Sequence, residues 1–381
     1  MGHSGWPLVP AGLDVEVVTA GHGDISGCRF EAHCAAERAA DPGPHTGVGA
    51  DPAHGVGSPA ADGHDPAQAH HAERTYAPAQ SCDDNGGRTN MADLEFGQLD
   101  VRYADHETLA LDGGVELSYE VRGEGPAVVM LNNFAMVSPF WHGFTTQLEG
   151  DFQLINYDLR NQGNSKPGPE KVRFVDHVED LKALLDHLKV DRTYLIGTSI
   201  STLIVRDFAL RYPERVAGLV LVGPAFSPNG GLRRELVTRS WVASLDSGGI
   251  PQFFNHLYAM SFCDQTINGG GLPAYLALRD SFASLFTAEG IKENFLASLE
   301  LDDNPELLSQ ITAPTLLILG DGDFSWSESV VEDALARIPG SRAVTLARAG
   351  HVPFFDDPDG FQKATGEFLR ELVAAGQHVS A

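Results

Sequence analysis

The sequence predicts an α/β fold built on a doubly wound, mostly parallel sheet. Short continuous apolar runs, typical of strands buried on both faces, alternate along the chain with segments of helical periodicity. Two segments of alternating apolar and polar residues, 100–111 and 115–122, come first and flank Asp112-Gly-Gly, which indicates an antiparallel hairpin. The sheet is therefore expected to start antiparallel and to continue parallel.

The elements expected after the hairpin follow one another in a regular order. Buried strands are predicted at residues 127–131, 152–157, 193–196, 216–222, 315–319 and 342–346. Helices are predicted at residues 174–188, 200–212, 327–337 and 360–374. These helices are expected to cover the sheet, as they do in doubly wound folds.

One long helical segment, residues 227–310, separates two of the predicted strands. Gly-rich breaks at residues 247–249 and 268–271 divide it. Its position predicts a helical cap, or lid, over the carboxyl ends of the strands. Its large apolar residues are expected to divide between the core of the cap and the wall of an apolar pocket, and the sequence does not sort them: Trp241, Phe253, Phe254, Leu257, Tyr258, Met260, Phe262, Tyr275, Phe282, Phe286 and Phe295.

The first part of the chain has a different composition from the rest. Residues 1–92 are rich in Gly, Pro, Ala, His and Asp, and we expect them to form a disordered tail. The predicted domains are then this tail, a core of residues 93–226 and 311–381, and the cap. Histidines of the tail are scattered rather than spaced as metal ligands, so no metal site is predicted.

Charge and cysteine content narrow the class of protein. A net charge of −26 argues against nucleic acid or an anionic membrane as a partner. The sequence shows neither a signal-peptide pattern nor an apolar run of transmembrane length. Four cysteines, three of them in the tail, do not suggest a disulfide framework. These features favour a cytoplasmic enzyme.

Residues 197–201, Gly-Thr-Ser-Ile-Ser, join a predicted strand to a predicted helix within a very short turn. Such a bend strains the backbone at its tip and needs small residues two positions away on each side, which Gly197 and Ser201 provide. Ser199 is expected to expose its hydroxyl beside the amides that open the helix. An ordinary strand–helix turn with a serine N-cap gives a similar pattern and is the alternative.

A serine hydroxyl needs a general base, and the base needs an orienting carboxylate. His351 lies in a loop directly after the last predicted strand, on the same rim of the sheet as Ser199. Asp323 follows the predicted strand 315–319 and is the predicted carboxylate. Asp321 is the alternative, and Asp323 is preferred because Asp321 is suited to capping the turn. The chain order Ser, Asp, His fits a hydrolase sheet.

Acyl transfer also needs donors for the oxyanion that develops in the transition state. The N–H of Ile200 at the helix start is one predicted donor, and the N–H of Phe134, in the loop after strand 127–131, is the other. Two asparagines in this loop would otherwise indicate a simple turn. Asn133, Trp141 and Phe226 are the predicted substrate contacts.

Several motifs in this order resemble the α/β-hydrolase superfamily over about residues 100–375. Residues 157–165, Tyr-Asp-Leu-Arg-Asn-Gln-Gly-Asn-Ser, resemble its Asp-x-Arg-Gly-x-Gly-x-Ser loop, and Gly350-His351 resembles its histidine loop. Asn132-Asn133-Phe134 stands where members usually carry His-Gly-x. Loops with asparagine at this place resemble those of enol-lactonases and of the hydroxyacyl transacylases of polyester and rhamnolipid synthesis. The resemblance implies no metal and no organic cofactor, and serine at position 199 disfavours the branches with an aspartate nucleophile.

The expected function is that of a serine hydrolase that cleaves an ester, lactone or thioester of an apolar small molecule through an acyl-enzyme. An acyltransferase or cyclase of secondary metabolism with the same residues is the first alternative. A ligand-binding protein without catalysis is the second, suggested by Ser201 and Asn132-Asn133, which depart from the family pattern.

Overall fold

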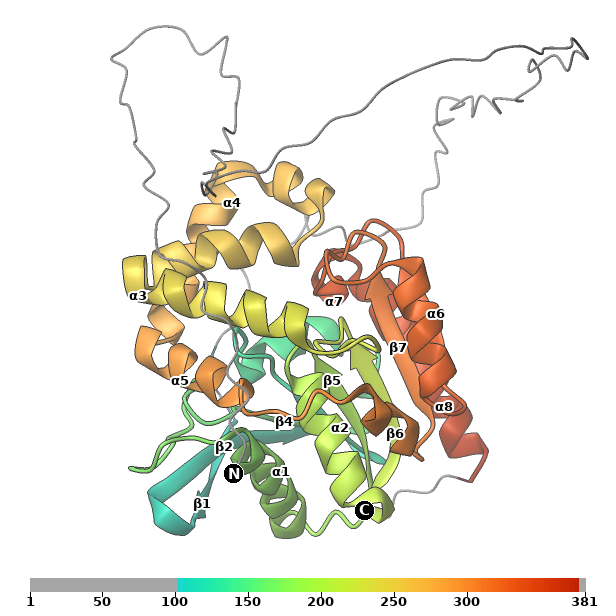
Figure 1. Cartoon of the computed structure of the whole chain (residues 1–381). Helices are drawn as coiled ribbons and strands as arrows, with labels where there is room; N and C mark the ends of the chain where they lie inside the picture. Colours follow the sequence, from blue (N-terminus) through green and yellow to red (C-terminus); the bar gives the residue numbers. More distant parts are fainter. Residues whose placement is uncertain (1–101, 104, 377–381) are drawn as a thin grey trace, which may run out of the picture. The chain divides into compact units, whose positions relative to one another are not determined.

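The computed structural model describes residues 102–103 and 105–376 (Figure 1). The predicted tail, residues 1–92, lies outside the described residues, as do Cys28, Cys34 and Cys82. Among the residues that are described, no helix has the length and apolar character needed to cross a membrane.

The described residues form one mostly parallel sheet. Its strands are β1 (Glu107–Leu111), β2 (Val115–Arg122), β3 (Ala127–Leu131), β4 (Gln153–Tyr157), β5 (Thr193–Thr198), β6 (Val216–Val222), β7 (Thr315–Gly320) and β8 (Arg342–Leu346). The spatial order is β1-β2-β4-β3-β5-β6-β7-β8. Strand β2 runs antiparallel to both β1 and β4, and the pairs from β4 to β8 are all parallel. The predicted antiparallel start and parallel continuation are confirmed.

The central strands are the apolar runs of the sequence. Every residue of β3, β5, β6 and β7 is buried, because helices cover both faces of a parallel sheet. The two edge strands, β1 and β8, are mostly half-buried or exposed. Burial therefore falls from the centre of the sheet to its rim, and the rigid centre carries the loops described below.

Helices lie on both faces of the sheet: α1 (Phe174–His187), α2 (Ser201–Arg211), α6 (Glu328–Arg337) and α8 (Pro358–Ala374). The register pairs Tyr194 with Gly218 and Gly197 with Leu221. Residues 194 and 197 are three apart and thus point to opposite faces. Gly197 faces α2, and Gly218 faces Leu372 of α8, so α2 and α8 cover opposite faces.

The long segment between β6 and β7 contains three helices, which we call the helical insertion: α3 (Leu232–Ser261), α4 (Asp264–Leu285) and α5 (Ala288–Ser298). At the Gly-rich stretches the backbone of α3 and of α4 leaves the helical conformation, so each consists of two helical parts joined at a kink. Gly249 has φ 62° and Gly271 has φ 57°, and each is followed two residues later by a proline inside the helix. Figure 1 shows the insertion in yellow and orange at one end of the sheet.

Short helices complete the described fold: the 3-10 segments Asp112–Gly114, Ser138–Phe144, Pro213–Arg215 and Pro305–Gln310, and α7 (Pro353–Asp356). Ser138–Phe144 and α7, like Pro213–Arg215, were not predicted. The first two are only a turn or two long and begin with proline near their first position, so their periodicity is too short to recognise. Both lie next to loops of the candidate site.

Candidate active site

Ser199 occupies the turn between β5 and α2. It has φ 51°, in the left-handed region that non-glycine residues rarely adopt, at a cost of about 1–3 kcal/mol. Its N–H donates to the carbonyl of Val222 at 2.9 Å, and the N–H of Thr202 donates to its carbonyl at 3.0 Å. These bonds fix the strained turn to β6 and to the first turn of α2.

Gly197 and Ser201 show why the turn tolerates serine at only one of its two flanking positions. A Cβ on Gly197 would lie 2.8 Å from the carbonyl oxygen of Ser201 and 2.9 Å from Val205 Cγ2. Ser201 Oγ instead accepts from the N–H of Thr198 at 2.8 Å and reaches the carbonyl of Leu131 at 3.1 Å. The unusual serine therefore links the turn to the end of β3.

Three side chains from distant parts of the sequence form one hydrogen-bonded chain. Ser199 Oγ lies 2.9 Å from His351 Nε2, and His351 Nδ1 lies 2.9 Å from Asp323 Oδ2. His351 is 7% exposed and Asp323 is 6% exposed. The structure thus brings together the predicted nucleophile, Ser199, the predicted base, His351, and the predicted orienting carboxylate, Asp323.

Gly223 allows the histidine loop to approach the sheet. This residue follows β6 and has φ 48°. A Cβ at this position would lie 2.0 Å from the carbonyl oxygen of His351. Only glycine leaves room for that contact, so the distance between Ser199 and His351 depends on the backbone at the end of β6.

The environment of Asp323 keeps its carboxylate charged. Burial raises the pKa of Asp323, but the neighbouring His351 and the hydrogen bonds from His351 and Ser325 lower it further, so the net pKa lies below its ordinary value. Ser325 donates both its N–H and its hydroxyl to Asp323 Oδ1, at 2.8 and 2.7 Å. Both carboxylate oxygens therefore have partners, and Oδ2 is left to His351.

Asp321, the reserve carboxylate, lies in the same loop but serves the backbone. Its Oδ1 accepts from the N–H of Arg348 at 2.7 Å. This bond braces the start of the histidine loop, where Arg348 itself has φ 58°. Asp321 is exposed and makes no hydrogen bond to His351 among the described residues, which leaves Asp323 as the partner of that ring.

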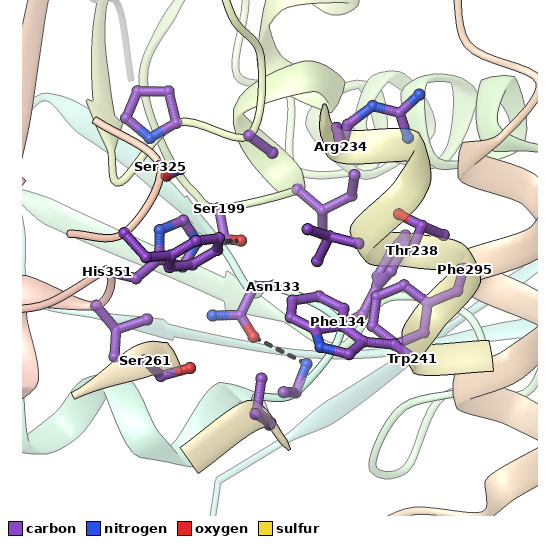
Figure 2. Close-up of a pocket in the computed structure, with 18 of the residues that line it drawn as sticks. Asn133, Phe134, Ser199, Arg234, Thr238, Trp241, Ser261, Phe295, Ser325 and His351 are labelled. Carbon is purple, nitrogen blue, oxygen red and sulfur yellow. Dashed lines mark hydrogen bonds between the residues drawn. The ribbon is translucent and has the colours of Figure 1, made fainter. Parts of the chain in front are cut away.

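The loop after β3 is held by polar contacts of its two asparagines. Asn132 Nδ2 donates to the carbonyl of Tyr157 at 3.1 Å and to Asp158 Oδ1 at 3.2 Å. Asn133 Oδ1 accepts from the N–H of Ala135 at 2.8 Å, the dashed contact in Figure 2. The asparagines therefore shape this loop as well as turning it.

Phe134 and Ile200 present the two predicted oxyanion donors. Within the described residues, neither N–H donates a hydrogen bond. The Phe134 ring packs against Phe295 with centroids 5.5 Å apart, which anchors the loop to the helical insertion. Two unpaired amides beside the Ser199 turn are the arrangement that an oxyanion site requires.

An apolar cavity of about 400 Å³ opens between these loops and the helical insertion. That volume is typical of sites for small organic molecules. Ser199, His351 and the predicted contacts Asn133 and Phe226 line it. Several large apolar residues of the insertion also line it, and they include Trp241, Phe254, Leu257, Tyr258, Phe262, Leu278, Phe282 and Phe295. Phe253, Met260, Tyr275 and Phe286 do not line it, so the structure sorts the two sets that the sequence left mixed.

Trp141, the third predicted substrate contact, lies elsewhere. It is fully buried and does not line the cavity. Its ring lies 5.2 Å from that of Phe354, and its Nε1 donates to Asn132 Oδ1 at 2.9 Å. The turn of residues Ser138–Phe144 rotates this side chain into the core, where it supports the asparagine loop from behind.

Two residues that the sequence analysis did not single out complete this support. Asp158 is fully buried and, besides Asn132, accepts from the N–H of Ser138 at 2.7 Å. Gln162 Nε2 donates to the carbonyl of Asn133 at 2.7 Å. Both belong to the loop of residues 157–165, which resembles a family motif. Asp158 directly follows a buried strand, and this position is the feature of the sequence that indicates a role near the site.

A metal or a covalent cross-link has no recognisable place in this site. Across residues 102–103 and 105–376, no group of three or more His, Cys, Asp or Glu side chains could hold a metal ion. Cys263, the cysteine in the described range, is free.

Comparison with known proteins assigns the family. A family model described as the alpha/beta hydrolase fold matches residues 126–358. The chain belongs to this family. It is 28% identical to the pimeloyl-[acyl-carrier protein] methyl ester esterase of Aeromonas salmonicida over 67% of this chain and 100% of that protein. Its sequence is also similar to polyketide synthase ThaQ of Burkholderia thailandensis, at 27% identity over 71% of this chain, but the match spans only 13% of that much longer protein.

A solved structure of the same fold is similar over most of its length. The thermophilic esterase of Thermogutta terrifontis superposes with a TM-score of 0.63 and 25% identity, covering 71% of this chain and 99% of that chain. The fold predicted from the sequence, a hydrolase sheet with helices inserted between two strands, is therefore confirmed. Esterases are thus among the relatives of this chain.

Proposed function

We propose that this α/β-hydrolase is a serine hydrolase that cleaves an ester, lactone or thioester of an apolar small molecule. One observation carries the proposal. The hydrogen-bonded chain Ser199–His351–Asp323 ends at the wall of an apolar cavity that is large enough for a small organic substrate. The esterase relatives support ester cleavage as the reaction class.

In this proposal His351 acts first as a base and then as an acid. Nε2 takes the proton of Ser199 as the hydroxyl oxygen attacks the substrate carbonyl, and the protonated ring then gives that proton to the departing oxygen or sulfur. Asp323 accepts from Nδ1–H, which keeps Nε2 free to act as the base and stabilises the imidazolium that forms. Water, activated by the same ring, cleaves the acyl-enzyme and regenerates Ser199.

The amides of Phe134 and Ile200 would stabilise the negative oxygen of the tetrahedral intermediate. Each donor of this kind contributes about 3–4 kcal/mol to the transition state. The helix dipole of α2 adds to the effect, because Ile200 lies at the positive end of that helix. The helical insertion, residues 227–310, is proposed to act as a cap that keeps bulk water from the bound acyl group.

A second candidate function is acyl transfer or cyclisation with the same residues. The similarity to part of a polyketide synthase favours it, as does the apolar wall of the cavity, which would slow attack by water. In that reaction an alcohol, amine or thiol takes the place of water at the acyl-enzyme. Product analysis with and without such an acceptor separates the two reactions.

Hydrolysis of p-nitrophenyl esters of increasing acyl length tests the proposal. Wild type should release p-nitrophenol in a burst followed by a slower steady phase, because these activated esters acylate Ser199 faster than water cleaves the acyl-enzyme. Ser199→Ala should lose kcat by roughly 10⁴–10⁶-fold with an unchanged fold by circular dichroism. Turnover that persists in Ser199→Ala, or no turnover of any ester by wild type, would contradict the proposal.

A further inference from the structure

A buried residue on the wall of the cavity, Thr238, carries a hydroxyl that has no partner among the described residues and is open to the cavity. Thr238 lies in α3, is 3% exposed and lines the cavity, but its Oγ1 makes no hydrogen bond. Threonine in the middle of a helix usually bonds to the carbonyl four residues earlier or points to solvent. Thr238 does neither, so its hydroxyl is available to a molecule in the cavity.

The same helix shows the ordinary solution at another buried hydroxyl. Ser244 is 6% exposed, and its Oγ donates to the carbonyl of Ser240 at 2.9 Å. Ser247 likewise donates to the carbonyl of Ser244 at 3.3 Å. The helix thus satisfies these hydroxyls internally but not Thr238. The hydroxyl of Thr238 is therefore left open to the cavity, where a molecule that binds there can supply its hydrogen-bond partner.

The other polar side chains near Thr238 already have partners. Arg234, one turn earlier in α3, binds Asp303 and the carbonyl of Ser298. Asn133 binds the N–H of Ala135 within its own loop. Around Thr238 the wall is aromatic, since Trp241 packs against Phe295 with centroids 5.2 Å apart. Of these three polar side chains, only that of Thr238 has no hydrogen-bond partner among the described residues.

The position of Thr238 relative to His351 indicates which half of the substrate it faces. Figure 2 shows Ser199 between two sides of the cavity, with His351 and Ser261 on one side and Thr238, among aromatic rings, on the other. The leaving group must lie within reach of His351, which gives it a proton. The acyl group then extends to the opposite side, where Thr238 lies.

Two further unpaired hydroxyls belong to the His351 side. Ser261 lies at the end of α3, and its carbonyl accepts from the N–H of Val352, next to His351. Tyr258, one turn earlier, has a buried hydroxyl without a partner among the described residues. Ser261 lies on the His351 side in Figure 2, and the Tyr258 ring packs on Phe262, which packs in turn on Phe355 of α7. These two hydroxyls therefore belong to the neighbourhood of the histidine loop.

We propose that the acyl group of the substrate carries an oxygen substituent, a hydroxyl or a ketone, that accepts a hydrogen bond from Thr238 Oγ1. The substrate class is then an ester, lactone or thioester of an oxygenated apolar acid. This inference rests on the proposed function, because it uses His351 to assign the two sides of the cavity. It adds a specificity-determining residue in the helical insertion.

Matched p-nitrophenyl esters test the inference. One series has plain acyl chains, and the other has chains of the same length with an oxo or hydroxyl group at successive carbons. Wild type should prefer the oxygenated ester at one position by about tenfold in kcat/KM, the effect expected of one hydrogen bond. Thr238→Val keeps the shape and removes the hydroxyl, so the ratio should fall to about one.

Controls separate this inference from the proposed function. Ser240→Ala, on the exposed face of α3, should keep the wild-type ratio. If turnover depends on Ser199 but no oxygenated ester is preferred, or if the preference survives in Thr238→Val, the inference about Thr238 is wrong. If wild type turns over no ester in either series, the proposed function fails as well.

Discussion

At the scale of single residues, the proposed chemistry depends on how His351 is held. Its two ring nitrogens face Ser199 and Asp323, so the carboxylate decides which nitrogen carries the proton. Asp321 lies two residues from Asp323 and has the same side chain, but it bonds the backbone of Arg348. The two aspartates therefore provide a matched comparison.

Asp323→Asn is expected to lower kcat by roughly 10³–10⁴-fold, because the amide that replaces the carboxylate favours the wrong tautomer of His351. Steady-state kinetics with a p-nitrophenyl ester measures the loss, and thermal unfolding shows whether the variant is folded. Asp321→Asn is the control and should retain most activity. A larger loss in Asp321→Asn than in Asp323→Asn would reverse the assignment.

Asp158 gives a prediction about pH and stability. Burial raises its pKa from 3.8 to about 6, against the hydrogen bonds that lower it. The folded state therefore keeps the proton to a higher pH than the unfolded chain does. The stability that this group contributes is complete below its unfolded pKa and is lost as the pH rises through 6.

Asp158→Asn should therefore be less stable than wild type, and the difference should shrink by roughly 1–2 kcal/mol between about pH 5 and pH 7.5. Urea denaturation of both proteins at several pH values measures it. The variant also loses acceptor capacity for the backbone of Ser138 and for Asn132, which accounts for its lower stability. A difference that stays constant or grows with pH would contradict the pKa shift.

At the scale of elements, the site forms where the ends of parallel strands and their loops meet. Ser199 follows β5, and the residue after β6, Gly223, is in contact with the backbone of His351. The loop after β7 carries Asp323, and the loop after β8 carries His351. The backbone at Gly223 thus limits how closely the loop of His351 approaches the sheet and the turn that carries Ser199.

Gly223→Ala should lower kcat strongly, because the new Cβ would overlap the carbonyl oxygen of His351 and its φ of 48° disfavours alanine. We expect a loss of stability of about 1–3 kcal/mol as well. Kinetics and thermal unfolding measure the two effects. Gly269→Ala, where a Cβ meets no atom within 4 Å, is the matched control and should behave as wild type. Full activity in Gly223→Ala would show that this contact does not position His351.

The sequence allowed the strands and the main helices to be predicted because their apolar periodicity is local. The turn around Ser199 and the positions of Asp323 and His351 were also predictable, since the ends of parallel strands share one rim. Trp141 was assigned to the substrate because it follows the asparagine loop, but its direction depends on a short 3-10 turn that packs it on Phe354. The roles of Asp158 and Thr238 depend on contacts between distant segments, which no local pattern contains.

At the scale of the whole molecule, the sheet, the helical insertion and the candidate site are all built from residues 107–374. A chain that begins at residue 93 should therefore have the same kcat/KM and melting temperature as the full chain. Kinetics and calorimetry of the two proteins compare them directly. A marked loss of either quantity in the shorter chain would show that residues 1–92 contribute to the site or to the stability of the fold.

Covalent labelling with a fluorophosphonate tests the central proposal most directly, because the reagent reacts with a serine whose hydroxyl is activated by a neighbouring base. Intact mass and peptide mapping should find one adduct per chain, on Ser199. Ser199→Ala should show none, and Asp323→Asn should react far more slowly. Absence of an adduct on wild type, or an adduct on another residue, would contradict the proposal that Ser199 is the nucleophile.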